Sequence, residues 1–579
     1  MYKNTRILLS LLVVAGCSND FEQANEVNTN NVLFNEVKLQ YNVENINDSS
    51  HPIFLNFISG NTFDLAINTK YVFNVPITLN NIQNFTLNGN GATLCFPYNG
   101  TGIEINSCSN VLVKNLVIDN SDSDGQRYYS LIDKGRIDIN SSQFVVLDSV
   151  TINEQLHPPT SGENHIQINI YDSTSNEVKN CTVNDSKGEL IVIDGSNDCK
   201  VINNRTFGGW SGIATKGRIL SWYRGYRTTI IDNNVYGTST ASITINDRQS
   251  VVENNVISGD SLSLTGGPGI RFGHYQDANG NDYVHLRAKN CTARGNRISN
   301  FLTSTPGPGG SSAAGIKIDA SVGVDGYGSI NVENNIIANC KSGIMVSNAP
   351  GQTGQLRDNT IEVDAEGISI FSPDINKLSS FQITGNNITS SGTNFMAGKE
   401  HVIRLFRTNA MLNGNMVTLN STYAYGKGIE IEQNSVDARI DIINNILNVS
   451  GNYGIHHTNA EMNLSEIKGN TINSPRIGML LKSKNSDISN NTIVNAEDYG
   501  ILLWGDEVNE NVENNDIENN FVSVSFSAAI RLHNTKNTRV LANNLDLLAG
   551  ASLYAVYKSA YNFNPIITSN SHNWPNQHN

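Results

Sequence analysis

Short stretches of alternating apolar and polar residues recur along most of the chain. Many contain Gly-Ile-x-Ile or a close variant, as at residues 343–346 (Gly-Ile-Met-Val) and 500–503 (Gly-Ile-Leu-Leu). A pair of asparagines followed by a β-branched residue precedes each of these two, at residues 334–336 and 490–492. Alternation of this kind predicts short β-strands, and the spacing of an amphipathic helix is missing.

The asparagine pairs define a repeat. One asparagine from each phrase gives the series Asn180, Asn204, Asn234, Asn255, Asn296, Asn335, Asn359, Asn387, Asn415, Asn445, Asn470, Asn491, Asn515 and Asn544. Most gaps in this series lie in the twenties, and the longest are 41 and 39 residues, on either side of Asn296. A period of this length with short strands predicts an all-β fold, a right-handed parallel β-helix solenoid that forms a single domain.

The repeated asparagine has a physical role in such a solenoid. Stacked coils lie about 4.8 Å apart, so equivalent side chains form columns along the axis. An amide inside a turn can then bond the coils on either side and satisfy buried backbone groups. We therefore expect a continuous column of buried asparagines.

The ends of the chain suggest other segments. Residues 1–17 resemble a bacterial lipoprotein signal peptide, with Lys3 and Arg6 before an apolar run that ends at Cys17, the expected site of lipid attachment. We expect a flexible tether over 18–35, an N-terminal cap over 36–75, the solenoid over 76–545 and a C-terminal cap over 546–579. An ordinary secretory signal is the alternative for the first segment. The expected location is the bacterial cell envelope, as an outer-membrane lipoprotein attached only through its lipid.

Composition narrows the class of partner. The formal net charge is −14, which disfavours a nucleic-acid binder. Asparagine is unusually frequent, with 87 residues in 579. Besides Cys17 the chain has six cysteines, none in a Cys-x-x-Cys pair, so a zinc site is not expected. These six cysteines could be small buried residues or could form disulfides, and the sequence leaves both possibilities open.

A resemblance to known families covers most of the chain. Residues 60–120 and the asparagine phrases are similar to the right-handed parallel β-helix superfamily that includes pectate lyases. A narrower region resembles polysaccharide lyase family 6, which includes alginate lyases and chondroitinase B. Its segments are 213–217 (Ile-Ala-Thr-Lys-Gly), 241–246 (Ala-Ser-Ile-Thr-Ile-Asn), 252–255 (Val-Glu-Asn-Asn) and 269–273 (Gly-Ile-Arg-Phe-Gly). This resemblance implies an acidic polysaccharide as substrate and Lys216 as the base.

The chain also departs from that family. Residues 246–248 are Asn-Asp-Arg where the family has Arg-His-Gly, and residues 209–211 are Gly-Trp-Ser where it has paired glutamates that bind calcium. The resemblance therefore implies Ca²⁺ as a cofactor, but the usual ligands are not matched, and the cofactor stays open.

Strand alternation places the two isoleucines of each phrase inward and the residues between and after them outward. The outward residues form two columns. The first is expected to contain Gln167, Val192, Ala214, Thr244, Arg271, Lys317, Met345, Ser369, Arg404, Glu430, His456, Leu480, Leu502 and Arg531. The second is expected to contain Asn169, Asp194, Lys216, Asn246, Gly273, Asp319, Ser347, Phe371, Phe406, Glu432, Thr458, Lys482, Trp504 and His533.

The centre of both columns is polar and charged, and the longest insertions flank it. Candidate substrate-binding residues are Asp194, Arg218, Trp222, Tyr226, Arg227, Asn246, His274, Tyr275, Lys317 and Asp319. Aromatic rings stack on sugar faces, and arginine pairs with carboxylates or sulfates. Long loops beside a regular scaffold frequently carry function, although a solvated loop with unrelated arginines would look similar.

Three functions remain open. A lyase needs a base near the proton beside a carboxylate and a cation to neutralise that carboxylate, roles that Lys216, Arg271 and Arg248 could fill. A glycoside hydrolase needs two carboxylates, and Glu430 and Glu432 are outward neighbours, with Asp319 as a further acid. A non-catalytic glycan-binding surface protein would need neither set.

Overall fold

The computed structural model describes most of the chain from residue 42 onward. The described residues are 42–119, 128, 130, 134–153, 165–185, 188–216, 225–259, 267–276, 282–302, 313–319, 328–347, 350–372, 374, 377–392, 401–420, 426–432, 438–450, 452–457, 462–463, 465–505, 512–548, 554–559 and 561–573. Cys17, the signal segment and the tether lie outside this range, as do Arg218 and Trp222. No helix in the described part of the chain is long and apolar enough to cross a membrane.

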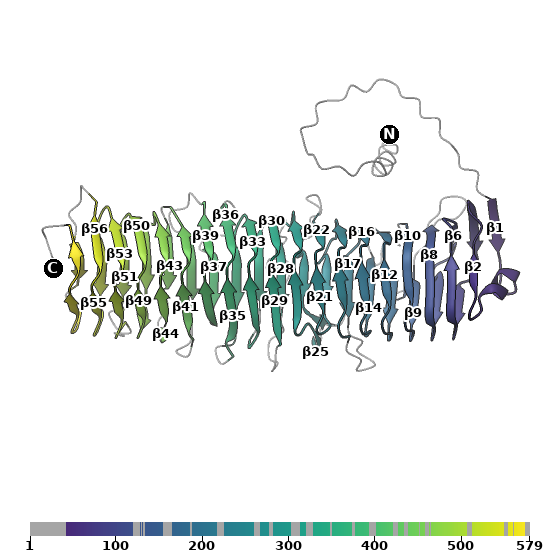
Figure 1. Cartoon of the computed structure of the whole chain (residues 1–579), viewed down its shortest axis with the longest axis horizontal. Coiled ribbons are helices and arrows are strands. Elements are labelled where there is room, and N and C mark those ends of the chain that lie inside the picture. The colour runs from purple at the N-terminus through teal and green to yellow at the C-terminus, as the bar shows by residue number, and fades with distance from the viewer. Residues whose placement is uncertain are drawn as a thin grey trace, which may run out of the picture. The chain divides into compact units, whose positions relative to one another are not determined.

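The repeating unit is one coil of three short strands. In a representative coil, β15 (Lys200–Ile202) and β16 (Arg205–Gly208) are followed by β17 (Ser211–Lys216). Each strand pairs in parallel with its counterpart in the next coil: β18 (Thr229–Ile231), β19 (Asn234–Tyr236) and β20 (Ile243–Ile245). The strands follow one another in chain order along the stack (Figure 1). This is the predicted right-handed parallel β-helix.

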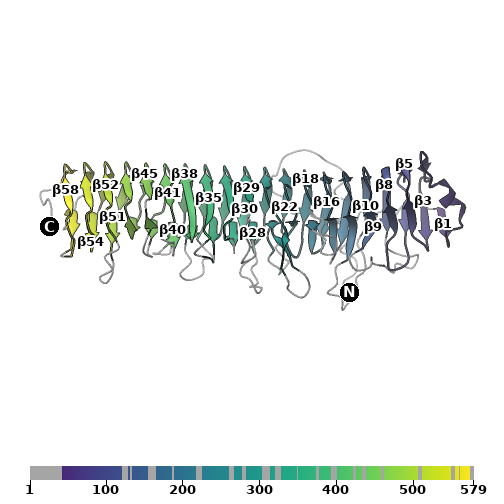
Figure 2. The same ribbon diagram turned by 90° about the horizontal axis from the view of Figure 1, so that it is seen from below.

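The third strand of each coil belongs to a separate ladder, which we call the third-strand ladder. It runs through β4 (Ile77–Asn80), β7 (Ile103–Asn106), β9 (Gly135–Asn140), β11 (Ile166–Tyr171), β14 (Glu189–Asp194), β17, β20, β23 (Ile270–Phe272), β28 (Ala314–Asp319), β31 (Ser342–Ser347), β34 (Ile368–Phe371), β37 (His401–Phe406), β40 (Lys427–Glu432), β43 (Tyr453–His457), β47 (Ile477–Leu481), β51 (Tyr499–Trp504), β54 (Ala528–His533) and β57 (Tyr554–Lys558). Figure 2 shows β9, β28, β40, β51 and β54 along one side of the stack, opposite the first strands of the coils, such as β29 (Ser329–Glu333) and β52 (Asp516–Glu518).

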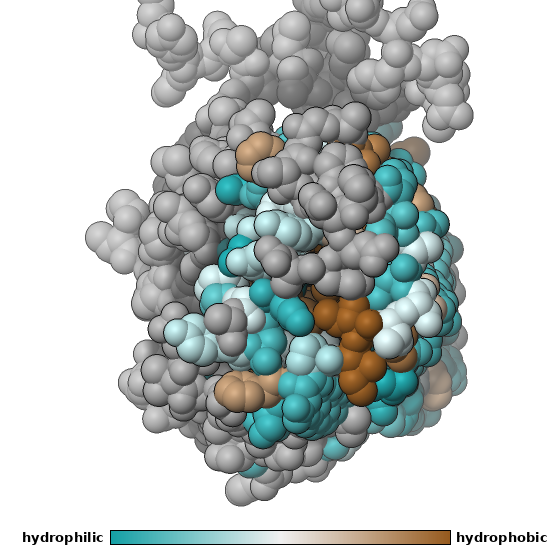
Figure 3. Space-filling model, turned by 90° about the vertical axis from the view of Figure 1, so that its left-hand side faces the viewer, coloured by the Kyte–Doolittle hydropathy of each residue, from teal (hydrophilic) through white to brown (hydrophobic). Residues whose placement is uncertain are grey.

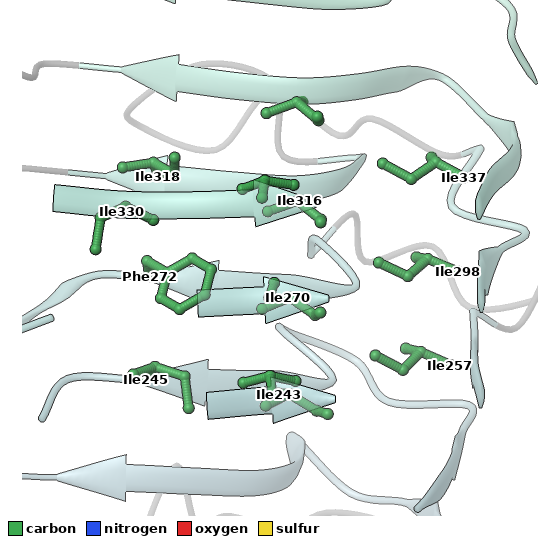
Figure 4. Packing of buried hydrophobic residues seen from close by; sticks show 14 of the residues in the cluster. Ile243, Ile245, Ile257, Ile270, Phe272, Ile298, Ile316, Ile318, Ile330 and Ile337 are labelled. Carbon is green, nitrogen blue, oxygen red and sulfur yellow. The ribbon is translucent and has the colours of Figure 1, made fainter. Parts of the chain in front are cut away.

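The core consists of columns of branched apolar side chains inside the coils. Ile243, Ile270 and Ile316 stack in one column, and Ile245, Phe272 and Ile318 stack beside it (Figure 4). All six are buried. Each fully buried side chain of this size stabilises the fold by roughly 1.5–3 kcal/mol, so the Gly-Ile-x-Ile phrase contributes to the stability of each coil.

The predicted asparagine column is present. Its buried members are Asn204, Asn233, Asn255, Asn296, Asn335, Asn359, Asn386, Asn415, Asn445, Asn470, Asn491, Asn520 and Asn543. Asn335 is typical: its Oδ1 accepts hydrogen bonds from the backbone N and the Nδ2 of Asn296, and its own Nδ2 donates to Ala293 O at 3.0 Å. The amides thus link three successive coils, as expected.

Five of the positions expected in this column were wrong. Asn180, Asn234, Asn387, Asn515 and Asn544 all lie outside it. The buried amide follows a residue in the left-handed region, and that residue need not be asparagine: Asp232 (φ 58°) precedes Asn233, and Ala542 (φ 53°) precedes Asn543. Cys181 occupies the place expected for Asn180, and its backbone N donates to Asn204 Oδ1.

Ladder strands extend past both expected cap boundaries. β1 (Asn42–Ile46) already pairs in parallel with β3 (Thr69–Phe73), and β58 (Ile566–Thr568) and β59 (Ser571–His572) continue the ladders beyond residue 545. Between β1 and β3, the 3-10 helix η1 (Pro52–Asn56) adds aromatic contacts to the first coil, where Phe54 packs against Phe73. The C-terminal end of the stack shows an apolar patch among polar residues (Figure 3).

All six cysteines after Cys17 are buried thiols: Cys95, Cys108, Cys181, Cys199, Cys291 and Cys340. Of the two possibilities left open by the sequence, they are small buried residues and form no disulfide among themselves.

Candidate functional site

The outward face of the third-strand ladder carries the two predicted columns. Register is the expected one from Val192 through Ala214 and Thr244 to Arg271, and onward to Arg531. It differs only at the first coil, where Asn169 pairs with Val192 and Tyr171 pairs with Asp194. This coil has no Gly-Ile phrase, so the sequence pattern placed Gln167 and Asn169 two residues too early.

The structure brings the central charged residues together on this face. Lys216 is in register with Asp194 on the preceding strand, and Asn246, Gly273 and Asp319 follow on the next three coils. Arg271 and Lys317 are adjacent in the first column. We call Lys216, Asn246, Arg271, Lys317 and Asp319 the basic cluster. These residues, far apart in sequence, share one side of the solenoid as predicted.

Carboxylates accompany the cations of the basic cluster. Lys216 Nζ forms an ion pair with Glu189. Arg271 Nη2 donates to Asp319 Oδ2 at 3.2 Å, and Lys317 Nζ lies 3.2 Å from the same oxygen. The ammonium group of Lys216, the base implied by the resemblance, thus has a carboxylate beside it as well as the cations of the cluster.

Gly273 stands in the second column of the basic cluster, where its missing side chain lets two polar groups lie close together. A Cβ atom built on this glycine would lie 3.1 Å from Arg271 Nε and 3.2 Å from Asn246 Oδ1. Asn246 Oδ1 is buried without a hydrogen-bond partner, and as an amide oxygen it accepts a hydrogen bond. The Arg271 guanidinium supplies N–H donors suited to an anionic group such as a carboxylate.

The remaining candidates border this region with different contacts. Tyr226 bridges to Arg248 in the turn after the third strand, and the Arg248 guanidinium lies 6.0 Å from the Tyr226 ring centroid. Arg227 is exposed and binds Asp198 through Nε and Nη2 at 2.6 and 2.7 Å. That ion pair occupies Arg227 on the turn, and it raises the pKa of the guanidinium and lowers the pKa of Asp198.

Two of the other candidate residues lie outside the described part of the chain, and two are described only by their backbone. Arg218 and Trp222 lie outside the described residues. His274 and Tyr275 are placed by their backbone on β24 (His274–Gln276), which pairs in antiparallel fashion with β25 (Asp282–Arg287). This hairpin follows directly after Gly273, so its backbone starts at the basic cluster.

A second group of titratable side chains lies further along the same face. His401 is fully buried, with Nε2 3.1 Å from Glu366 Oε1 and Nδ1 2.9 Å from Glu430 Oε2. Glu430 Oε1 lies 3.1 Å from Lys427 Nζ and 3.3 Å from His456 Nδ1. We call Glu366, His401, Lys427, Glu430 and His456 the His–Glu cluster.

The two carboxyl groups and the imidazole hold one another in charged forms. Burial disfavours ionisation of Glu430, but His401, His456 and Lys427 outweigh it and lower the pKa of Glu430 far below its usual 4.5. The pKa of Glu366 is lowered in the same way by His401, and the two carboxylates raise the pKa of His401 above 6.5 in spite of burial. A carboxyl group held this firmly ionised does not suit the proton-donor role considered for Glu430.

Glu432 has a different environment. Arg404 donates to its Oε2 from Nε at 3.0 Å and from Nη2 at 2.6 Å. Phe406 lies beside this pair and stacks on Phe371 with ring centroids 4.6 Å apart. Glu430 and Glu432 thus have separate partners, and the arrangement of two free carboxylates around one glycosidic bond is not found here.

Sequence reasoning missed Glu189, Glu366, His401 and Lys427. All four start or precede a third strand. Glu366 and Lys427 come directly before the glycine of the phrase, whereas Glu189 and His401 hold the same position in coils that have another residue in place of the glycine. The glycine itself faces inward, since a Cβ on Gly343, for example, would meet Ile361 Cγ2 of the core at 2.5 Å. A third outward column, one residue before each glycine, could have been read from the sequence on this basis.

The described residues contain no group of three or more His, Cys, Asp or Glu side chains arranged to hold a metal ion. The positions where the resembled family has paired glutamates are Gly209, Trp210 and Ser211, which offer no carboxylate. The residues described here therefore do not fit the calcium site implied by the resemblance, and we assign no step to a metal.

Comparison with known proteins identifies the family. The family model for the right-handed β-helix region matches residues 217–402 and 427–574, more than half of the chain. The chain belongs to the right-handed β-helix family. No curated protein matches the sequence.

The chain is also similar, at low sequence identity, to several solved structures. A PL6 alginate lyase in complex with a trisaccharide has 15% identity and a TM-score of 0.42, over 69% of this chain and 88% of the lyase. The A-module of mannuronan C-5 epimerase from Azotobacter vinelandii has 13% identity and a TM-score of 0.34, over 60% and 86%. The receptor-binding domain of the Siphovirus 9NA tailspike has 11% identity and a TM-score of 0.42, over 69% and 75%. These likenesses concern the fold.

Proposed function

We propose that this protein acts on an acidic polysaccharide and cleaves it by β-elimination at the basic cluster. The observation that supports this proposal is the position of Arg271 on the outward face that also carries Lys216, with Asn246 on the coil between them. The Arg271 guanidinium would bind a uronate carboxylate, and the carbon next to that carboxylate would then lie toward Lys216. A lyase needs a base and a cation beside the substrate carboxylate, and Lys216 and Arg271 could fill these roles. A hydrolase needs two carboxylates around one glycosidic bond, and this arrangement is not found among the described residues.

In the proposed reaction, the Arg271 guanidinium binds the substrate carboxylate. Its N–H donors stabilise the negative charge that develops on the carboxylate oxygens as the adjacent C–H bond breaks. Lys216 in its neutral form takes that proton. The electron pair forms a carbon–carbon double bond as the glycosidic oxygen leaves and takes a proton from water. Glu189 positions Lys216, and the ion pair must release its proton before Lys216 can act as a base.

The test is absorbance of the unsaturated product after incubation with alginate, pectin or chondroitin. Lys216→Ala and Arg271→Ala should each reduce kcat/KM by about 10²–10⁴-fold, the usual contribution of proton transfer or charge stabilisation. Lys482→Ala changes a lysine at the end of a different third strand and serves as the control. Full activity in Lys216→Ala would remove this assignment. New reducing ends without absorbance would indicate hydrolysis instead.

We also propose that the mature protein is anchored to the bacterial envelope through a lipid on Cys17, as the N-terminal sequence suggests. The test is the distribution of Cys17→Ser between the membrane and soluble fractions of the producing cell. Release of the variant, with the wild type retained in membranes, is the expected result. Equal distribution of both proteins would contradict the anchor.

A further inference from the structure

The second strands of the coils carry almost no charge on their outward side. They stack in register from β19 to β50 (Thr492–Ala496), and Figure 1 marks this ladder at β22 (Val256–Ser258), β30 (Ile336–Cys340) and β39 (Met416–Leu419). One residue of each strand, such as Ile337, is buried in the core, so its two neighbours point outward.

These outward residues form two columns, which together we call the second-strand face. The first column contains Asn234, Val256, Arg297, Ile336, Thr360, Asn387, Met416, Ile446, Thr471 and Thr492. The second contains Tyr236, Ser258, Ser299, Ala338, Glu362, Thr389, Thr418, Asn448, Asn473 and Val494. Only Arg297 and Glu362 among them are charged, and their charges are opposite.

The first strands of the same coils have a different surface. Glu253, Arg294, Glu333 and Arg357 follow one another in register there. They are paired within the chain, with Arg294 Nη2 2.8 Å from Glu253 Oε2 and Arg357 Nη2 3.1 Å from Glu333 Oε2. The scarcity of charge is therefore a property of the second-strand face and not of these coils as a whole.

Large apolar side chains are exposed on the second-strand face. Val256, Ile336, Met416 and Ile446 stand in one column and are 41%, 39%, 40% and 44% exposed. Exposed apolar surface framed by polar residues marks interaction sites on soluble proteins. The chain has a net charge of −14 and repels a second copy through most of its surface, whereas this face has no net charge. A second copy of the chain can therefore approach through this face.

Arg297 and Glu362 make the second-strand face self-complementary. Both are exposed, and neither has an ion pair or hydrogen bond among the described residues. Arg297 lies one coil before Ile336, and Glu362 lies one coil after it. A twofold axis at Ile336, perpendicular to the solenoid axis, sets the coil of Arg297 in each copy over the coil of Glu362 in the other. The two residues are then offset by about 6.8 Å along the strand, which their long side chains span.

We propose that the protein forms an antiparallel homodimer through the second-strand face, with the twofold axis at Ile336 and two Arg297–Glu362 ion pairs between the copies. The first columns overlap from Arg205 to Ile446, eight coil steps or about 38 Å. Four strand residues add a width of about 13 Å, so the two copies together bury about 1,000 Å², enough for a specific interface.

The third strands lie outside this interface, so the dimer leaves both third-strand ladders open. It would offer two basic clusters to one long polysaccharide, a consequence that rests on the proposed function. The dimer itself does not depend on catalysis.

Sedimentation velocity of the full chain carrying Cys17→Ser, and therefore without a lipid, should show a dimer at micromolar concentration. Arg297→Glu and Glu362→Arg each set like charges against each other twice and should weaken the dimer at least about 10-fold. A mixture of these two variants should associate as the wild type does, because opposite charges face each other again in both contacts. Arg294→Glu, on the first strand of the same coil, is the control and should leave association unchanged.

Crosslinking locates the axis. A bismaleimide should join two copies of Ile336→Cys, since the native thiols after Cys17 are buried. Ile446→Cys is the matched control: it is similarly exposed, but its two copies would lie eight coils, or about 38 Å, apart and should not be joined.

Three results would overturn the dimer. They are a protein that stays monomeric up to millimolar concentration, a dimer unaffected by Arg297→Glu, and a dimer joined through Ile446→Cys but not through Ile336→Cys. Circular dichroism of every variant confirms that the solenoid is intact. Absorbance of the unsaturated product is measured separately, so the proposed function can fail while the dimer holds, and the reverse.

Discussion

His401 and Glu430 face each other across adjacent coils, with Nδ1 and Oε2 2.9 Å apart and neither side chain more than 4% exposed. Removing one partner of such a pair leaves the other charge buried without compensation. Glu430→Gln should therefore lower the free energy of unfolding by about 3–5 kcal/mol, measured by chemical denaturation followed by circular dichroism.

A matched exposed pair gives the control for this prediction. Lys468 and Asp487 are 3.3 Å apart but 41% and 45% exposed. Asp487→Asn should change the free energy of unfolding by less than about 1 kcal/mol, because water screens the pair. Equal effects of the two substitutions would show that the buried network contributes no more than a surface ion pair.

Stability should depend on pH through the same network. The folded pKa of His401 is raised above 6.5, so its contribution is complete below pH 6.5 and is lost as pH rises through the folded value. The folded pKa values of Glu366 and Glu430 are lowered below 4.5, so their contribution is complete above pH 4.5 and is lost as pH falls through those values.

The thermal midpoint should accordingly be highest between about pH 4.5 and 6.5 and fall on both sides. His401→Gln should remove much of the fall on the alkaline side. Midpoints measured in a series of buffers at constant ionic strength check this. An unchanged alkaline slope in the variant would assign the effect to other groups.

Gly273 gives a test of the basic cluster in which no functional side chain is itself substituted. A Cβ at this position would crowd Arg271 Nε and Asn246 Oδ1, at 3.1 and 3.2 Å. Gly273→Ala should displace both groups and reduce kcat/KM for β-elimination at least 10-fold, with little loss of stability. Asn140→Ala, at the end of β9, is the control. Wild-type kinetics in Gly273→Ala would show that the substrate binds elsewhere.

The sequence predicted the solenoid because the asparagine and Gly-Ile-x-Ile phrases recur along most of the chain. Alternation alone was enough to place Arg271, Lys317 and Arg404 in one column. The exact position of each buried asparagine depends on the backbone conformation of the residue before it, which the composition does not specify. Asp232 and Ala542 adopt the left-handed turn that asparagine takes elsewhere, and the buried column shifts by one residue at each. Partners such as Glu366 were missed because the residue before the glycine of each phrase was not counted among the outward positions.

Removing one amide from the asparagine column should destabilise the coils next to it. Asn335→Ala would leave the Asn296 backbone N without its acceptor and Ala293 O without its donor. Each unsatisfied buried group costs about 1–3 kcal/mol, so the variant should lose several kcal/mol. Hydrogen exchange should show the loss in the adjoining coils first, because a solenoid is stabilised by neighbour contacts. Asn334→Gly is the control, since Asn334 holds a positive φ of 54° that glycine accepts readily.

The buried cysteines predict a sharp difference in reactivity between the folded and unfolded chain. Burial raises the pKa of the Cys181, Cys199, Cys291 and Cys340 thiols to about 12 and that of Cys95 to about 11. Because only the thiolate reacts, iodoacetamide at pH 8 should label these residues very slowly in the native protein.

In denaturant the same thiols return to ordinary values near 8.5 and should all be labelled within minutes. Peptide mass spectrometry assigns each site, and the order in which the sites become reactive with increasing denaturant reports which coils open first. Fast labelling of Cys291 in the native protein would be inconsistent with its burial in the solenoid. Such a result would require the coils around Asp247 to open on their own, because the Cys291 thiol donates to Asp247 O inside the stack.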